Sequence, residues 1–323
     1  MHETAAHIRT RMTEAWAIDH PVMSAGMGHL AVPRLVAAVS AAGGLGVLAT
    51  STLTPDEVRD SIREVRGLTN APFGANILMR SDHASAIASV VVDECVPVVN
   101  LALGIDADLV AAVHRYGGKV VSTVTTLRHA HKAEACGADA LIATGHEAGG
   151  HGGDLSTMVL VPLLVHHVAV PVIAAGGFSD GAGLAAALML GAEGISMGSR
   201  FALSAESPIH PRVRELLSAA GASDTIVTDQ IDGLPSRVLR TELSLAIAAS
   251  SGYGAGNAEG KVSPGRDTFA ALRRGDLDRG VVAIGQVVGA IHDTLTCAEI
   301  IQRTVSDARE LIASRAGAFI QPI

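Results

Sequence analysis

The sequence predicts an α/β fold, a (β/α)8 TIM barrel with a small, mostly helical cap domain inserted after strand eight. Three observations predict it. Short apolar runs rich in β-branched residues recur eight times, which is the strand count of this barrel. Their starts lie 20 to 32 residues apart, which leaves room for a strand, a helix and two loops. The runs are continuous rather than alternating, as expected when both faces of a parallel sheet are covered.

The eight predicted strands are the runs near Val22, Val47, Phe73, Val98, Val120, Ala140, Val172 and Gly194. Helix signals lie between them. Thr54-Pro55-Asp56-Glu57 is a capping box with proline in the first turn, and Gly67 is the expected stop of that helix. Gly117, Gly137 and Gly191 are expected to end later helices in the same way.

After the eighth strand the regular spacing fails. Residues 206–280 read as a cap, or substrate, domain, whereas residues 1–205 and 281–323 read as the barrel. The apolar-periodic stretch from Val281 to Ile312 is expected to supply the helix that closes the barrel. Within the cap, Lys261 and Arg266 could meet an anionic substrate, although basic residues in such a loop are usually only solvated.

Composition limits the function classes. With 323 residues and 48% hydrophobic residues, the chain can bury a large core, so global disorder is excluded. Lys+Arg number 24 against 32 Asp+Glu, a net charge of −8, and aromatic residues make up only 2%. This balance argues against a nucleic-acid partner and leaves a small-molecule substrate.

Cysteine usage and the N-terminal residues predict a cytoplasmic protein. Cys95, Cys136 and Cys297 are isolated, which argues for a reducing compartment and against a disulfide scaffold or zinc knuckle. The first residues mix charges and lack the apolar core of a signal peptide. Leu35 to Pro55 carries no charge over a bilayer-spanning length, but its glycines divide it into a helix and a strand, so we expect buried core and no membrane partner.

The loops after strands seven and eight predict a phosphate site. Gly176 and Gly177 lie in the first loop, and Ser196-Met197-Gly198-Ser199 leads into the second. Glycines let backbone N–H groups approach a phosphate, and these two loops are a frequent phosphate site in such barrels. Either loop alone could be a simple turn, but together they favour a bound phosphate. Gly181-Ala182-Gly183 imitates a dinucleotide fingerprint, yet it lacks the acidic residue that such a motif needs after the next strand.

The segment after the sixth strand, Thr144-Gly145-His146-Glu147-Ala148-Gly149-Gly150-His151, is the most unusual of the chain. A loop this rich in glycine can wrap around a flat ligand and present an imidazole to it. His151, flanked by glycines at the catalytic face, is the predicted catalytic residue, whereas His146 is expected to be a surface residue. The spacing does not match the helical zinc motif, so no metal is predicted.

Two further segments would face the same opening. The loop after the first strand contains Ala25, Gly26 and Met27, and the third strand contains Asn76. An asparagine amide offers both a donor and an acceptor, which suits the edge of a heterocycle. The simpler alternatives are that Met27 is packing and that Asn76 caps a turn.

Taken together, these motifs resemble the nitronate monooxygenase (2-nitropropane dioxygenase) family, which includes the flavin-dependent enoyl-ACP reductases. The resemblance rests on GHEAGGHGGDLSTMVLVP, PVIAAGGFSDGAGLAAALMLGAEGISMGSRF, PFGANIL, AGGLGVLAT and GQVVGAIHDTLTCAEII. It implies a TIM barrel that binds FMN non-covalently, with His151 at the catalytic position. It also implies a homodimer, as is common in the family. The FMN contacts that it implies, together with the loop glycines above, are Ala25, Gly26, Met27, Asn76, Thr144, Gly149, Gly176, Gly177, Ser196, Met197, Gly198 and Ser199.

Two chemistries remain open within the resemblance. The first, favoured at this point, is a nitronate monooxygenase that oxidises alkyl nitronates with O2 to a carbonyl compound and nitrite. The alternative is an NAD(P)H-dependent reductase of an enoyl thioester or a quinone, with NAD(P)H as co-substrate. The family commonly reads A-P-M at Ala25-Gly26-Met27 and Gln at Thr144, and these departures bear on the subfamily. Outside the oxidoreductases, an isomerase or aldolase would need a catalytic Lys or Glu at a strand end, where the chain offers little except Glu147.

Overall fold

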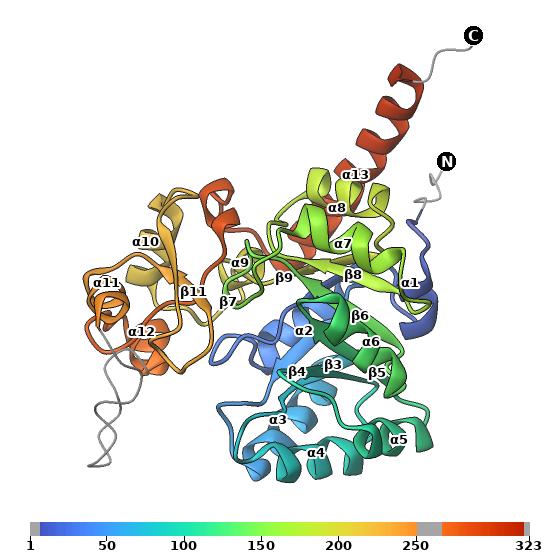
Figure 1. The fold of residues 1–323 in the computed structure, drawn as a ribbon, viewed down its shortest axis with the longest axis horizontal. Helices are drawn as coiled ribbons and strands as arrows, with labels where there is room; N and C mark the ends of the chain where they lie inside the picture. Colours follow the sequence, from blue (N-terminus) through green and yellow to red (C-terminus); the bar gives the residue numbers. More distant parts are fainter. Residues whose placement is uncertain (1–6, 251–266, 320–323) are drawn as a thin grey trace.

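The computed structural model describes residues 7–250 and 267–319, and its centre is a barrel of eight parallel strands (Figure 1). The hydrogen-bonded order is β1-β9-β8-β6-β5-β4-β3-β2. The ring is closed between β1 and Leu45, which precedes β2: Leu45 N–H donates to Val22 O, and Ser24 N–H donates to Leu45 O, both at 3.0 Å. All eight predicted strands are confirmed. They are β1 (Val22–Ser24), β2 (Gly46–Ala49), β3 (Phe73–Leu78), β4 (Val98–Ala102), β5 (Lys119–Val124), β6 (Ala140–Thr144), β8 (Val172–Ala175) and β9 (Gly194–Met197).

Helices surround the strands, as the predicted alternation requires. The outer helices are α2 (Pro33–Ala41), α3 (Pro55–Leu68), α4 (Ala84–Asp93), α5 (Ala107–Arg115), α6 (Leu127–Ala135), α7 (Thr157–Val165), α8 (Gly181–Met189) and α13 (Cys297–Phe319). The Thr54 and Glu57 capping box opens α3 as predicted, but the helix continues past Gly67 to Leu68. The glycines at 117, 137 and 191 have positive φ after their helices, as a glycine stop requires.

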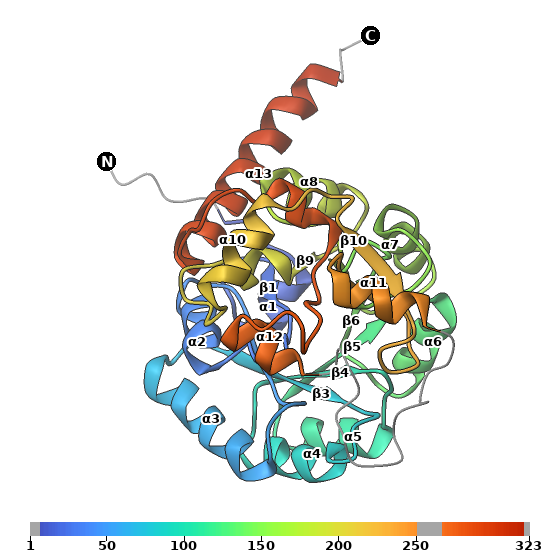
Figure 2. The ribbon, with the colours of Figure 1, turned by 90° about the vertical axis from the view of Figure 1, so that its left-hand side faces the viewer.

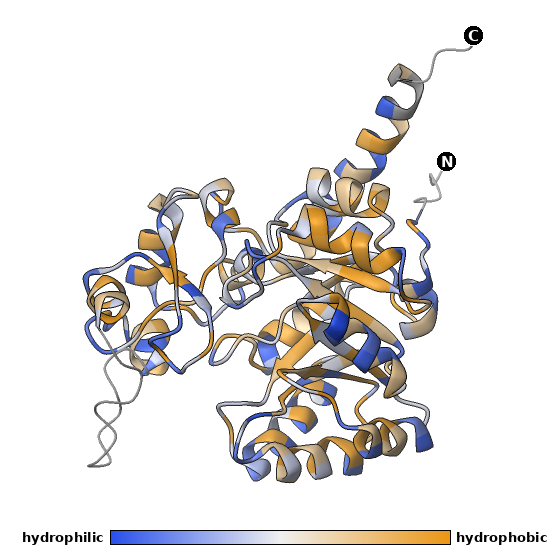
Figure 3. Ribbon diagram, viewed as in Figure 1, coloured by the Kyte–Doolittle hydropathy of each residue, from blue (hydrophilic) through white to orange (hydrophobic). Residues whose placement is uncertain are grey.

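The apolar residues form two shells. The largest clusters lie between the strands and the helices, and Figure 3 shows hydrophobic residues both in the barrel strands and in the surrounding helices. Inside the barrel, strand residues such as Val47 and Val121 meet Met12 and Trp16 of α1 (Arg11–Trp16), which close the amino-terminal end. The opposite end of the barrel is therefore the end that can open to a ligand.

A separate group of elements covers that open end (Figure 2). It contains α10 (Pro211–Ala219), β10 (Thr225–Thr228), β11 (Ser236–Leu239), α11 (Glu242–Ala249) and α12 (Thr268–Arg274), and we call these elements the cap. A short strand of the barrel loop, β7 (Gly150–His151), pairs with β11, so the cap sheet has the order β10-β11-β7. The cap and the predicted catalytic loop therefore share one small sheet. The predicted domain boundaries stay a prediction.

The stretch from Val281 to Ile312 supplies the predicted closing helix, but only from Cys297 onward. Residues 281–296 form an irregular strip that contains the 3-10 helix η2 (Gln286–Ala290), and α13 begins only at Cys297, after a Thr296 and Glu299 capping box. The apolar residues of the strip are buried between the cap and the barrel, which explains their sequence pattern without a helix. At Gly285 a side chain would meet the backbone oxygen of Glu147 at 2.8 Å, so the strip lies directly against the catalytic loop.

The small α9 (Ser199–Ala202) follows β9 and completes the described elements. Gly181 of the apparent dinucleotide fingerprint serves helix packing, because a Cβ there would meet the backbone nitrogen of Ala308 in α13 at 2.5 Å. Among the described residues, none of the helices is long and apolar enough to cross a membrane. Lys261 and Arg266 of the predicted cap lie outside the described residues.

Candidate active site

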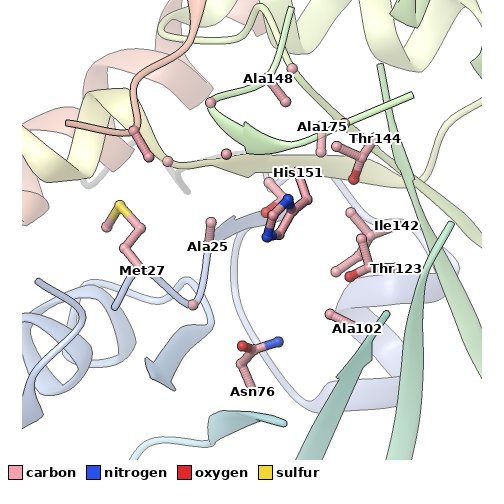
Figure 4. Close-up of a pocket in the computed structure, with 18 of the residues that line it drawn as sticks. Ala25, Met27, Asn76, Ala102, Thr123, Ile142, Thr144, Ala148, His151 and Ala175 are labelled. Atoms are coloured by element: carbon pink, nitrogen blue, oxygen red, sulfur yellow. The ribbon is translucent and has the colours of Figure 1, made fainter. Parts of the chain in front are cut away.

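A cavity of about 780 Å³ lies at the carboxyl ends of the barrel strands, between the barrel and the cap. This volume and position are typical of a cofactor site in such a barrel. The His151 imidazole points into the cavity, between Ala25 and Met27 on one side and Thr123 and Ile142 on the other (Figure 4). Residues far apart in the sequence therefore meet at the place where the fold predicts chemistry.

The structure brings the predicted site residues together, with one exception. His151 and the predicted cofactor contacts line the cavity, apart from Met197. The assignment of Met197 to the cofactor site stays a prediction that only its backbone could meet, because its side chain is buried in the hydrophobic core between strand and helix. The reason is the twofold alternation of a strand: Ser196 faces the barrel interior, and its neighbour therefore faces outward. Whether the lining residues bind FMN stays a prediction.

The loops after β8 and β9 form a cradle for a small anionic group. Gly176 and Gly177 have φ of +97° and +86°, a conformation that disfavours any side chain. Gly198 differs, because its φ is −96° and an added Cβ would meet nothing nearer than Ala25 Cβ at 3.7 Å. Neither backbone conformation nor packing requires glycine there, yet a side chain would occupy the cavity. The residues present thus fit a phosphate held by backbone N–H groups, as FMN would need.

At the start of α8, the Asp180 carboxylate accepts a hydrogen bond from Gly183 N–H at 2.9 Å, so this N–H is not available to an anion in the cradle. Ser199 Oγ accepts a hydrogen bond from Gly285 N–H at 3.0 Å, which ties the loop after β9 to the strip below the cap. The cradle is therefore built from loop backbone whose position is fixed on both sides.

A row of amides fixes the other end of the cavity. Asn76 Nδ2 donates to Asn100 Oδ1 at 2.7 Å, and Asn100 Nδ2 donates to Thr123 Oγ1 at 3.0 Å. Because its amide nitrogen is engaged, Asn76 keeps its Oδ1 as an acceptor on the side of Gly26, where a Cβ would collide with the Asn76 side chain. Asn76 is therefore buried and held in one orientation, and it does not cap a turn. A fixed amide of this kind is what recognition of a heterocycle edge would require.

The glycine-rich loop after β6 is held by contacts within the protein. The Glu147 carboxylate accepts hydrogen bonds from Thr157 N–H and Oγ1 at about 3 Å, so it anchors the start of α7. A Cβ at Gly149 would meet the Ile284 backbone at 2.6 Å. His146 is exposed, as predicted. No group of three or more His, Cys, Asp or Glu side chains within residues 7–250 and 267–319 is arranged to hold a metal ion.

His151 has partners from the cap that the sequence analysis missed. Its Nε2 lies 3.1 Å from Asp232 Oδ2, and its Nδ1 lies 3.4 Å from Pro235 O. The hydrogen bond with Asp232 raises the pKa of His151, while burial and the nearby Arg80 act in the opposite direction. Asp232 lies 81 residues beyond His151 in an irregular segment, and no motif links the two, so only the folded chain reveals the pair.

The ionisable lining of the cavity is cationic although the chain is acidic. Arg80, after β3, and His129 and Lys132, on α6, line its outer part and are exposed. Glu147 is the one carboxylate among the described lining residues, and it accepts a hydrogen bond from Thr157 Oγ1. The basic side chains lie after β3 and β5, across the barrel from the cradle after β8 and β9. They can therefore meet an anionic group other than a phosphate in the cradle.

Comparison with known proteins gives consistent results. The family model described as nitronate monooxygenase matches residues 9–307. A curated relative from Mycobacterium tuberculosis, "(3aS,4S,5R,7aS)-5-hydroxy-7a-methyl-1-oxo-octahydro-1H-indene-4-carboxyl-CoA dehydrogenase", is 39% identical over 93% of this chain and 96% of its own length.

Two solved structures are similar over nearly the whole chain. FabK from Thermotoga maritima, an enoyl-ACP reductase, is 38% identical, covers 97% of this chain and 100% of its own, and has a TM-score of 0.91. A nitroalkane oxidase from Streptomyces ansochromogenes is 28% identical, covers 94% of this chain and 99% of its own, and has a TM-score of 0.82. The relatives thus include both chemistries that the sequence analysis left open.

Proposed function

Because the chain belongs to the nitronate monooxygenase family, we propose that it is an FMN-dependent oxidoreductase that transfers hydride between NAD(P)H and an enoyl thioester of coenzyme A type. This places the thioester chemistry ahead of nitronate oxidation, the reverse of the order favoured from the sequence. The relatives at 38–39% identity include a CoA-thioester dehydrogenase and an enoyl reductase, whereas the nitroalkane oxidase is at 28%.

The observation that carries the proposal is the cationic outer part of a large cavity, opposite the glycine cradle. Coenzyme A and NAD(P)H both carry phosphates at a distance from the reacting carbons. Arg80 and Lys132 are long side chains that can pair with such phosphates at the mouth. An alkyl nitronate is small and carries a single charge, so it would leave these side chains without a role.

The chain's own residues would divide the work as follows. The Gly177 and Gly198 backbone would hold the FMN phosphate, and Asn76 Oδ1 would accept a hydrogen bond from the ring edge. Bound FMN would supply the two-electron redox chemistry. The cap and the glycine-rich loop would exclude water, and the apolar lining would orient the acyl chain.

His151 would handle the proton. Reduction of an enoyl thioester adds a hydride at the β-carbon and a proton at the α-carbon. An imidazole whose pKa is raised by Asp232 stays protonated nearer to neutral pH, which suits donation of that proton or of a hydrogen bond to the thioester carbonyl. In the reverse direction the same nitrogen would accept the proton.

Nitronate oxidation is the second candidate, supported by the family model and by the nitroalkane oxidase. A protonated His151 would also suit a nitronate anion. Steady-state rates of the FMN-loaded protein distinguish the two: NAD(P)H oxidation with a 2-enoyl-CoA, against oxygen uptake and nitrite release with an alkyl nitronate. We expect kcat/KM to favour the thioester by at least about a hundredfold, a difference of roughly 3 kcal/mol in transition-state stabilisation. Efficient nitronate turnover with negligible thioester turnover would overturn the proposal.

A further inference from the structure

We propose that Asp232, in the cap loop between β10 and β11, is a positioning residue that fixes the orientation and proton occupancy of the His151 ring. Only the expected change in turnover rests on the proposed function. The contact between Asp232 and His151 does not depend on it. It assigns to the cap a part in the chemistry in addition to covering the cavity.

The first support is the pair of acceptors around the ring. Asp232 Oδ2 lies 3.1 Å from Nε2, and Pro235 O lies 3.4 Å from Nδ1. Both are acceptors, so both hydrogen bonds form only when both ring nitrogens carry hydrogen. A neutral ring would direct one lone pair at an acceptor. The surroundings therefore select the doubly protonated ring and hold its plane.

The second support is the way the Asp232 carboxylate is held. Its Oδ1 accepts a hydrogen bond from Leu234 N–H at 3.2 Å, which leaves Oδ2 directed at the imidazole. The same loop is tightened where Gly233 N–H donates to Asp229 O at 2.8 Å, and Gly233 has a φ of +84°. The carboxylate is thus preset by its own turn.

The third support is the sheet that joins the cap to the catalytic loop. Ser236 is opposite His151, and Arg237 is opposite Gly150, in the antiparallel register of β11 and β7. Buried Arg237 donates from Nε to His146 O at 3.0 Å and from Nη1 to Thr225 Oγ1 at 2.8 Å. The backbone of His151 and the loop that carries Asp232 are therefore fixed relative to each other.

Other charged groups lie near the His151 ring and also influence its protonation. Arg80, from the loop after β3, opposes protonation of His151. His129 and Lys132 of α6 line the same cavity. Glu147 is bound by Thr157. Arg237 on β11 is also cationic. Among these groups, Asp232 is the carboxylate that lies against the imidazole.

The test combines a direct titration of His151 with kinetics on the FMN-loaded protein. Nitrogen NMR of histidine-labelled protein, with the His151 signal assigned by His151→Gln, follows the ring in the wild type and in the Asp232→Asn, Asp232→Glu and Asp229→Asn variants. Asp229 is the matched control, because it lies in the same loop and its carboxylate accepts a hydrogen bond from Gln230 Nε2 instead.

We expect Asp232→Asn to lower the pKa of His151 and to move the pH profile of kcat to lower pH. We also expect it to reduce kcat at neutral pH about tenfold or more, with little change in KM. Asp232→Glu should recover part of both effects, and Asp229→Asn should change neither. An unchanged His151 titration in Asp232→Asn would overturn the proposal. A shifted titration with unchanged thioester turnover would support the positioning role and contradict the use of His151 in the proposed reaction.

Discussion

The two sides of the cavity are built in different ways. The cradle side consists of Gly176, Gly177 and Gly198, which follow neighbouring strands of the barrel, and the loop after β9 is tied to the strip at 281–296 by the hydrogen bond from Gly285 N–H to Ser199 Oγ. The histidine side consists of His151 on a strand that the barrel loop shares with the cap, and of Asp232 from the cap itself. The comparison teaches that the proposed phosphate side is formed by loops of the barrel, whereas the histidine side requires a strand and a carboxylate of the cap.

The largest expected effect falls on the histidine side. His151→Ala should reduce kcat for the thioester about 10²- to 10⁴-fold, the usual contribution of a positioned acid or base, because the other histidine among the described lining residues, His129, is exposed on α6. FMN should stay bound, since the cradle does not involve this side chain. Flavin absorbance of the purified variant and its turnover check both statements, and near-normal turnover would remove His151 from the mechanism.

On the cradle side the expected effect is on cofactor binding. Gly198→Val should weaken FMN binding about 5- to 150-fold, because its methyl groups enter the cavity at a typical overpacking cost of about 1–3 kcal/mol. Gly67→Val is the matched control, since nothing lies within 4 Å of that position on α3. Fluorescence titration of the apoprotein with FMN measures the difference. Wild-type affinity in Gly198→Val would disprove the placement of the phosphate.

Removal of the cationic mouth should affect substrate affinity more weakly. Exposed ion pairs contribute about 0.2–1 kcal/mol each, so Arg80→Ala combined with Lys132→Ala should raise KM for an enoyl-CoA about two- to thirtyfold. The KM for the corresponding N-acetylcysteamine thioester, which lacks the phosphates, should not change. Arg115→Ala combined with Lys119→Ala removes the same charges at the other end of the barrel and should leave both constants unaltered. Equal effects on both thioesters would contradict a phosphate contact.

The smallest expected effect is on stability. Because the pKa of His151 is raised in the folded protein, its pairing with Asp232 stabilises the folded state below the ordinary histidine pKa of about 6.5. This contribution is lost as pH rises through the raised value. Both side chains are partly exposed, so solvent screening limits it to roughly 0.2–1 kcal/mol. Urea unfolding of the wild type and of Asp232→Asn at pH 6 and pH 9 should differ at the lower pH alone; an equal difference at both values would assign the effect to something other than this titration.

The cradle side could be predicted from the sequence because its signals are local. Each buried parallel strand is a continuous apolar run, and the loop that follows it contains its glycines within a few residues. The motif around Met197 was assigned as a block, although alternate residues of a strand face opposite sides and the Met197 side chain faces the core between strand and helix. Arg80 could have been found as well, since it follows the third predicted strand closely.

The histidine side could be predicted only in part. His151 was identified from its glycine-rich surroundings, but its partners come from a segment with no regular period, whose strand β11 pairs with β7 over a separation of more than eighty residues. The start of the closing helix could not be located for the same reason: the apolar residues of the strip at 281–296 are buried one by one between cap and barrel, which imitates a helical period. Tertiary contacts determined both, and a single sequence does not display them.

The most direct test of the account is an anaerobic visible spectrum of the FMN-loaded protein, recorded with NADH or NADPH and then with a 2-enoyl-CoA. The account predicts that a reduced nicotinamide bleaches the flavin band and that the enoyl-CoA restores it without oxygen. The account would be contradicted if neither nucleotide bleached the flavin, or if no enoyl thioester reoxidised a flavin that they had bleached. Rapid bleaching by an alkyl nitronate instead would establish nitronate oxidation, the second candidate.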